Sequence, residues 1–164
     1  MSTLELAHNV ITEHQQEAPV NIEGIIRNLG IKLDKKADLD VHISGQIQKL
    51  PDNGYQISTN KENHYFRQRF TMAHELGHYL FHRKMIGDGV DDDMMFRSTI
   101  EGNFFNQSIT QSEETEANQF AASVLMPARL ISNLQKEGFN TAAELAKKLQ
   151  VSETAMSIRL DSLT

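Results

Sequence analysis

The chain has 164 residues, of which 39% are hydrophobic and 23% charged, and its formal net charge is −6. This composition is that of an ordinary folded protein and excludes collagen-like, low-complexity and extensively disordered chains. The absence of cysteine excludes disulfides and cysteine-ligated metal sites, so any metal must be held by His, Asp or Glu. The length suits one domain, or one domain with a small appendage.

The net negative charge argues against a broad nucleic-acid-binding surface, and we expect no direct binding of nucleic acid. No apolar run has membrane-spanning length, and the first ten residues contain Glu5 but no basic cluster. We therefore expect neither a signal peptide nor a membrane anchor. Together with the absence of cysteine, this favours a cytoplasmic location.

The amino-terminal third predicts two helices followed by a sheet. Ser2-Thr3-Leu4-Glu5 is a capping box that opens the first helix, and Asn21 can cap the second. Between residues 31 and 60, apolar and polar residues alternate on either side of an Asn53-Gly54 turn, which is a strong hairpin signal. We expect a small antiparallel sheet over these residues.

Residues 63 to 83 carry the apolar spacing of a buried helix, and Gly77 within it suggests close approach by a neighbouring element. His74 and His78 lie at positions i and i+4, on one face of the helix, so both imidazoles can bind one metal ion. Glu75 points about a quarter-turn away, toward the water that such an ion would bind. This H-E-x-x-H arrangement is typical of zinc hydrolases, in which it supplies two ligands and a general base.

Residues 84 to 109 show no clear periodicity and predict a long irregular segment of the kind that often covers a site. Asp91 to Asp93 within it are interpreted as a solvated acidic loop in preference to a cation site. The apolar residues between Met94 and Phe105 either line a peptide cleft or attach the segment to the core.

Helices are predicted again after this segment. Thr110-Gln111-Ser112-Glu113 is a capping box, and the helix that it opens runs to Met126, before Pro127. Further helices are expected over residues 128–137, 141–149 and 152–163.

Zinc needs a third protein ligand, and the helix after residue 110 offers several carboxylates. The candidates are Glu113, Glu114 and Glu116. The small apolar face around Ala117 is best able to pack against a glycine-containing helix, and Glu114 lies on that face. Glu114 is therefore the expected ligand, with Glu116 as the fallback. Asn118, one turn beyond Glu114, is expected to orient a metal-bound imidazole.

Hydrolysis of a peptide also needs a donor that stabilises the tetrahedral oxyanion. Tyr55, His82 and Arg97 are candidates between which the sequence does not decide. His82 continues the i, i+4 series, but it lies two turns from His74, too far along the helix to share its ion. We expect it to be a packing or rim residue.

Two blocks of sequence carry a family resemblance. Residues 69–82 (RFTMAHELGHYLFH) closely resemble the metal helix of the ImmA/IrrE metallopeptidases, and residues 116–127 (EANQFAASVLMP) resemble their second signature. Glu114 matches the position of the family's ligand glutamate, and the resemblance extends loosely over residues 20–163. It implies a zincin-like fold, a Zn2+ cofactor and endopeptidase activity of the gluzincin-like kind.

The resemblance also implies a kind of substrate. Family members are usually encoded beside a helix-turn-helix repressor that they cleave or inactivate, and many belong to mobile elements, prophages or stress responses. Many carry an amino-terminal helix-turn-helix domain that does not precede the metal motif here. We therefore expect the repressor to be a separate protein.

Residues 141–164 have the apolar spacing of a helix-turn-helix pair. Their three basic residues are balanced by three acidic ones, and the presumed recognition helix, residues 153–163, offers only Arg159 as a cation. Because DNA reading requires neutralisation of phosphates, we expect a structural helical pair that belongs to the same domain as residues 1–140.

The sequence thus predicts an α+β, zincin-like metallopeptidase domain with a small antiparallel sheet packed on helices. Glu75 would be its catalytic base, His74, His78 and Glu114 would hold Zn2+, and its substrate would be a protein. Two alternatives stay open: a non-catalytic module that binds a repressor without cleaving it, and a DNA-binding regulator that acts through the carboxy-terminal helices.

Overall fold

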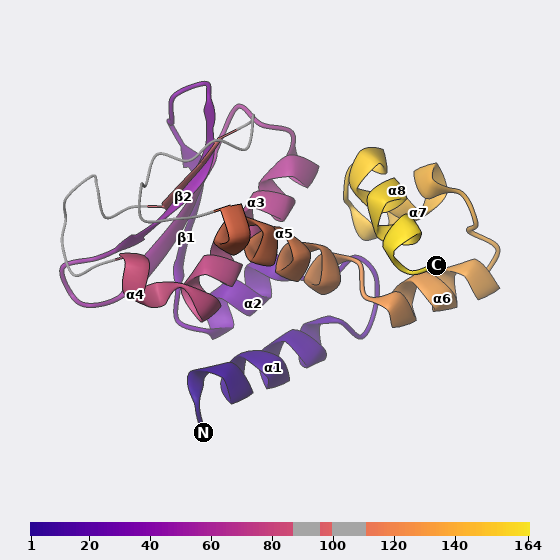
Figure 1. Cartoon of the computed structure of the whole chain (residues 1–164), viewed down its shortest axis with the longest axis horizontal. Helices are drawn as coiled ribbons and strands as arrows, with labels where there is room; N and C mark the ends of the chain where they lie inside the picture. Colours follow the sequence, from indigo (N-terminus) through magenta and orange to yellow (C-terminus); the bar gives the residue numbers. More distant parts are fainter. Residues whose placement is uncertain (87–95, 100–110) are drawn as a thin grey trace.

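The computed structural model describes residues 1–86, 96–99 and 111–164, which form one sheet and a group of helices beside it (Figure 1). The helices are α1 (Thr3–His14), α2 (Ile22–Asn28), α3 (Tyr65–Phe81), α4 (Arg83–Ile86), α5 (Gln111–Leu125), α6 (Ala128–Lys136), α7 (Ala142–Leu149) and α8 (Glu153–Ser162). The strands are β1 (Lys32–Ala37), β2 (Ile43–Lys49), β3 (Tyr55–Asn60) and β4 (Phe96–Thr99). The predicted α+β class is confirmed. Among the residues described, no helix combines the length and the apolar character needed to cross a membrane.

The sheet has the strand order β1-β3-β2-β4 and is mixed, which corrects the expectation of a wholly antiparallel sheet. Strand β2 is antiparallel to both β3 and β4, whereas β1 is parallel to β3. Since β1 and β2 run in opposite directions, β3, inserted between them and antiparallel to β2, must be parallel to β1. Alternation of apolar residues identifies strands but not their neighbours, so it could not predict this order.

The β2–β3 hairpin confirms the predicted Asn-Gly turn. Asn53 has a φ of 65°, in the left-handed region that asparagine tolerates better than most residues. The amide of Leu50 donates to the carbonyl of Gly54 at 2.8 Å and closes the turn.

Two regular elements interrupt the segment predicted to be irregular, residues 84–109. Helix α4 follows α3 almost directly, and β4 adds to the free edge of β2 with Phe96 opposite Ile47. Strand β4 has four residues, too few for a periodic signal, and its hydrogen bonds come from a strand distant in sequence. Asp91 to Asp93 lie outside the described residues.

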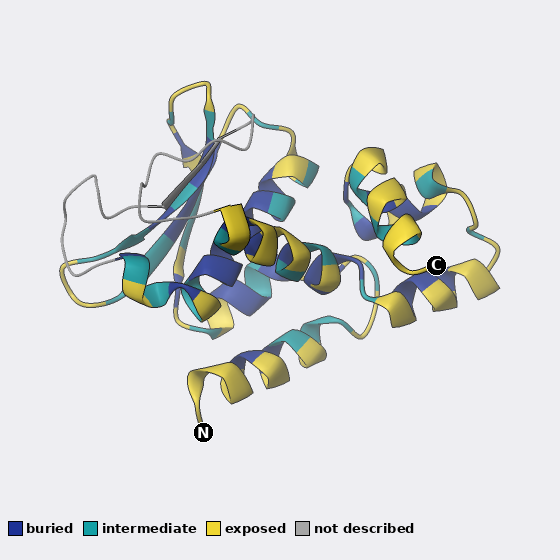
Figure 2. Ribbon diagram, in the orientation of Figure 1, coloured by how far each residue is buried: buried dark blue, intermediate teal, exposed yellow. Residues whose placement is uncertain are grey.

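Helix α3 is the central element of the fold. It begins two residues later than predicted, with His64 capping its first turn by accepting from the amide of Phe66, and its residues from Thr71 to His78 are all buried. Figure 2 shows this dark blue stretch between the sheet and α5, whereas α1 exposes most of its surface. Ile47 and Ile57 of the sheet and Met72 and Leu76 of α3 belong to one fully buried core.

The carboxy-terminal helices α7 and α8 form the predicted pair, with the capping box Thr141–Glu144 at the start of α7 and Ser152 capping α8. Buried Arg69 of α3 connects this pair to the rest of the fold. Its guanidinium donates to the carbonyls of Gln150 at 3.1 Å and Val20 at 2.9 Å, on either side of α3 in the sequence.

Candidate metal centre

Helices α3 and α5 approach each other closely at Gly77, as the sequence predicted. A Cβ added to Gly77 would lie 3.1 Å from Cδ1 of Phe120 and 3.3 Å from Cα of Ala117. Any larger side chain would push the helices apart, so glycine permits their separation to stay small. This packing brings the first turn of α5 to the face of α3 that carries the two motif histidines.

The side chains of His74, His78 and Glu114 converge where the two helices meet. His74 Nε2 lies 3.0 Å from Oε2 of Glu114, and His78 Nε2 lies 2.9 Å from Oε1 of the same carboxylate. The two imidazole Nε2 atoms are 3.1 Å apart. All three residues are buried, and in the part of the chain that the structure describes they are the one group placed to share a metal ion.

The pKa of each of His74, His78 and Glu114 depends on at least one of the other two groups. Although burial raises the pKa of the Glu114 carboxyl, its hydrogen bonds to His74 and His78 outweigh burial and hold that pKa at about 2. Burial lowers the pKa of His74, but the contacts with Glu114 and the charge of Glu75 raise it above its ordinary value. The pKa of His78 is lowered by burial, with the nearby imidazoles of His74 and His82 acting in the same direction. Glu114 is therefore anionic at neutral pH, as a ligand must be.

The donor set fits zinc. Two imidazole nitrogens and one carboxylate oxygen are a known catalytic combination, which leaves a coordination position for water. Tetrahedral zinc with bonds of about 2.0–2.1 Å separates its ligand atoms by roughly 3.4 Å, a few tenths of an ångström more than the separations found here. If both Nε2 atoms carried protons toward Glu114, two N–H groups would also face each other across 3.1 Å. A cation between the three atoms would satisfy every lone pair.

Glu75 lies beside this group on α3. Its side chain is fully buried, in the turn of helix between His74 and His78. A carboxylate in this position can accept a proton from a water bound at the open position, which is the chemistry expected of a general base.

Three polar side chains lie around the group formed by His74, His78 and Glu114. His74 Nδ1 lies 2.7 Å from Oδ1 of Asn118, where an N–H of the ring donates to the amide oxygen, as the sequence led us to expect. His82 is buried, with Nδ1 2.9 Å from Nδ1 of His78, so of the two expected roles, packing or rim, the structure favours packing. Glu116 is half exposed and lies 3.6 Å from His82 Nε2, away from the convergent group. This placement favours Glu114 over the fallback ligand Glu116.

Of the remaining oxyanion candidates, Tyr55 lines a hollow together with His82. The Tyr55 ring packs edge-on against Tyr79 at 5.1 Å between centroids, and the Arg83 guanidinium lies 5.9 Å from the Tyr55 ring. Arg97 belongs to β4, with its Cα opposite Gln46, and its side chain lies outside what the structure describes. The pairing of His82 with Glu116 was not foreseen, because it joins two helices whose packing no local pattern specifies.

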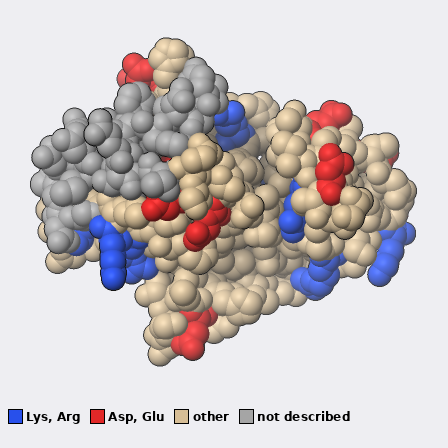
Figure 3. Space-filling view, viewed as in Figure 1, with Lys and Arg blue, Asp and Glu red and all other residues tan. Residues whose placement is uncertain are grey.

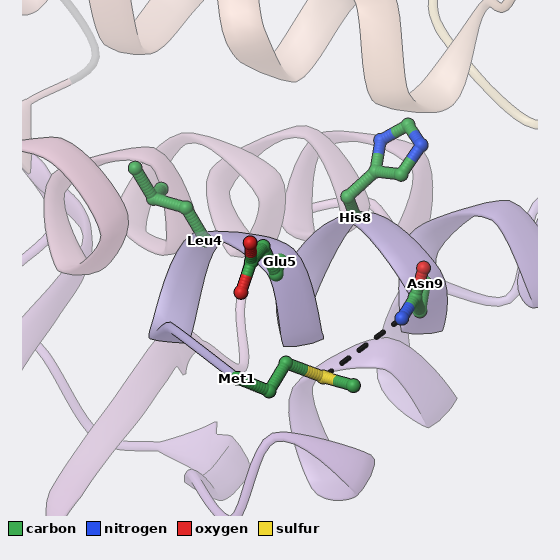
Figure 4. A pocket seen from close by; sticks show the side chains of 5 residues that line it. All are labelled: Met1, Leu4, Glu5, His8 and Asn9. Carbon is green, nitrogen blue, oxygen red and sulfur yellow. Dashed lines mark hydrogen bonds between the residues drawn. The ribbon is translucent and has the colours of Figure 1, made fainter.

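A hollow on the exposed face of α1 contains another histidine and glutamate (Figure 4). It has a volume of about 600 Å³ and is lined by Met1, Leu4, Glu5, His8 and Asn9. His8 and Glu5 are exposed on one helix, and among the residues that the structure describes no third ligand lies beside them. This hollow therefore offers no metal site comparable with the one between α3 and α5.

Comparison with known proteins agrees with the geometry. Over 101 residues the chain is 36% identical to the radiation response metalloprotease IrrE of Deinococcus radiodurans, a match that covers 60% of this chain and 28% of that protein. Over 92 residues it is 39% identical to the radiation response metalloprotease IrrE of Deinococcus deserti, covering 54% of this chain and 30% of the relative. The chain thus matches less than a third of the length of either relative.

A solved structure shares the fold. A Mycobacterium tuberculosis transcriptional regulator matches 96% of this chain and 46% of its own length with a TM-score of 0.61, at 15% identity. The model of a peptidase family, described as the IrrE N-terminal-like domain, matches residues 26–161, which include every element from β1 to α7. The chain belongs to the family of the IrrE N-terminal-like domain, as the resemblance to the ImmA/IrrE metallopeptidases predicted.

Proposed function

We propose that this protein is a zinc-dependent endopeptidase that hydrolyses a peptide bond in a regulatory protein, namely a helix-turn-helix repressor. The observation that carries the proposal is the convergence of His74, His78 and Glu114 beside the buried carboxylate of Glu75. Membership of a peptidase family and similarity to two proteins named as metalloproteases support it.

His74, His78 and Glu114 would hold the zinc through Nε2, Nε2 and the carboxylate. When bound there, zinc would lower the pKa of a coordinated water toward neutrality and polarise the scissile carbonyl. Glu75 would take a proton from the attacking water and deliver it to the nitrogen of the leaving amine as the C–N bond breaks. Asn118 would keep the His74 ring in place through its contact with Nδ1.

The identity of the substrate rests on the family resemblance, since many members are encoded beside a repressor that they inactivate. The same reasoning and the lack of cysteine support a cytoplasmic location. A direct test is to incubate the purified protein and zinc with the product of the adjacent regulatory gene and to read fragment masses. We expect defined fragments with the natural chain and intact substrate with Glu75→Gln. If Glu75→Gln relieved repression fully without cleavage, the protein would be a binding module.

The carboxy-terminal helices do not favour a DNA-binding role. Nε of Arg159, the single cation of α8, donates to the carbonyl of Met126 at 2.9 Å. On the face shown in Figure 3, basic and acidic side chains are interspersed over this part of the molecule. Phosphate binding needs several basic groups directed at one surface.

A further inference from the structure

Three imidazoles follow one another along α3 at intervals of one turn. The ring centroids of His74 and His78 are 4.7 Å apart, and those of His78 and His82 are 5.1 Å apart. His82 caps the carboxyl end of the helix and retains only 7% of its exposure. A polar ring so buried is costly unless its nitrogens have partners, and the partners of His82 are His78 and Glu116.

The contact between His78 and His82 has a direction. Two Nδ1 atoms at 2.9 Å form a hydrogen bond only if one carries a hydrogen and the other a lone pair. For the Nε2 lone pair of neutral His78 to bind a metal, Nδ1 of His78 must carry the hydrogen and Nδ1 of His82 must accept it. The hydrogen of neutral His82 then lies on Nε2, which faces the Glu116 carboxylate at 3.6 Å. The first contact is within hydrogen-bond distance, whereas the second is slightly longer than a hydrogen bond.

We propose that His82 is a positioning residue that fixes the orientation and tautomer of His78, with Glu116 fixing those of His82. This inference rests on the zinc site proposed above. The two ligand imidazoles would then be held alike, each through Nδ1: His74 by Asn118 from α5, and His78 by His82 from its own helix. Because Glu116 is half exposed and its contact is long, it contributes less than His82 does.

The affinity for zinc tests the proposal without reference to catalysis. In competition with a chromophoric chelator, we expect His82→Leu to bind zinc about 10–100-fold more weakly, as is usual when the hydrogen-bond partner of a ligand is lost. His82→Gln, whose amide oxygen can accept from His78, should recover most of the affinity. Glu116→Gln should stay within about threefold of the natural chain. His8→Leu, on the exposed face of α1, is the matched histidine control and should change nothing.

The positions of the hydrogens on the ring nitrogens of His78 and His82 give a second test. A purely structural role of His82 would not fix these positions. In 15N-resolved NMR spectra of the zinc-loaded protein, we expect a hydrogen on Nδ1 of His78 and on Nε2 of His82. Zinc bound with undiminished affinity by a folded His82→Leu variant, or a hydrogen on Nδ1 of zinc-loaded His82, would overturn this inference alone. Failure of the natural chain to bind zinc would instead overturn the proposed function.

Discussion

Gly77 of α3 and Ala117 of α5 set the distance between the two helices that carry the proposed metal ligands. The contact involves the backbone of Ala117, whose Cα would lie 3.3 Å from a Cβ on residue 77. A flexible side chain could turn aside, but a helix backbone can yield only by moving the whole of α5. The reach of Glu114 to the two histidines therefore depends on the absence of one methyl group.

Replacing Gly77 by alanine tests which has the larger effect on stability: the helix propensity of the residue or its packing against α5. Alanine favours a helix interior over glycine by about 1 kcal/mol, whereas overpacking of a rigid contact typically costs about 1–3 kcal/mol. We expect Gly77→Ala to lower the free energy of unfolding by about 1 kcal/mol and to weaken zinc binding, because Glu114 moves away with α5. Urea denaturation and zinc competition measure the two effects. A variant that is more stable and binds zinc normally would contradict the packing account.

Asn118 is predicted to act through His74. Asn118→Ala removes the acceptor for the Nδ1 hydrogen of His74 and should weaken zinc binding about tenfold. Asn118→Asp keeps an acceptor at that position and should retain the affinity. Gln119→Ala, at the next, exposed position of α5, is the control. Equal zinc affinities in all three variants would show that His74 needs no such partner.

Arg69 is predicted to couple residues 141–164 to residues 1–140. Arg69→Leu removes the guanidinium donor from the carbonyl of Gln150 and from that of Val20, which keeps only the amide of Ile22 as a donor, and should destabilise the protein by about 3 kcal/mol. The control is Arg129→Leu, since exposed Arg129 donates to the carbonyl of Gln15 and its loss should cost less than about 1 kcal/mol.

Thermal unfolding of the natural chain should show one transition. Two separate transitions, with the first at α7 and α8, would contradict a single domain.

The lowered pKa of Glu23 in α2 predicts that the stability of the protein depends on pH in the acidic range. Burial raises its pKa, but hydrogen bonds from the Tyr65 hydroxyl and Lys35 outweigh burial and lower that pKa below 4.5. A lowered pKa in the folded state means that ionised Glu23 stabilises the protein above pH 4.5, and that this contribution is lost as the pH falls through the folded value.

Glu23→Gln should therefore be less stable than the natural chain by about 1 kcal/mol at pH 7, and the difference should shrink below pH 4.5. Urea midpoints measured in parallel at pH 7 and pH 3 check this, with the exposed Glu17→Gln as a control. A difference that stays constant across this range would mean that the ionised form of Glu23 contributes nothing.

Local signals in the sequence predicted much of this fold. The capping box at Ser2 and the turn at Asn53 are short-range features whose geometry is decided within four residues, and the structure confirms both, whereas Thr110 of the other predicted capping box lies outside the described residues. The histidine pair on α3 is likewise fixed by helical periodicity. Gly77 indicated that another helix would come close, which narrowed the search for a third ligand to the apolar face of α5.

Features that depend on distant partners could not be predicted. Strand β4 is defined by the edge of β2, and the parallel direction of β1 follows from the insertion of β3. His82 was expected to be a packing or rim residue, and it is buried, but its contact with the ring of His78, one turn away, was not predicted because only its distance from His74 was considered. Its pairing with Glu116 requires the crossing geometry of α3 and α5, which no single segment encodes.

The most direct test of the metal centre is to measure the zinc stoichiometry of two single-substitution variants. Their substituted residues lie two positions apart on α5. Metal-free natural chain, Glu114→Gln and Glu116→Gln are each titrated with zinc, and the bound metal is counted. The convergence of His74, His78 and Glu114 predicts one zinc per natural chain, the same for Glu116→Gln, and none retained by Glu114→Gln. Zinc lost from Glu116→Gln but kept by Glu114→Gln, or no zinc on the natural chain, would contradict it.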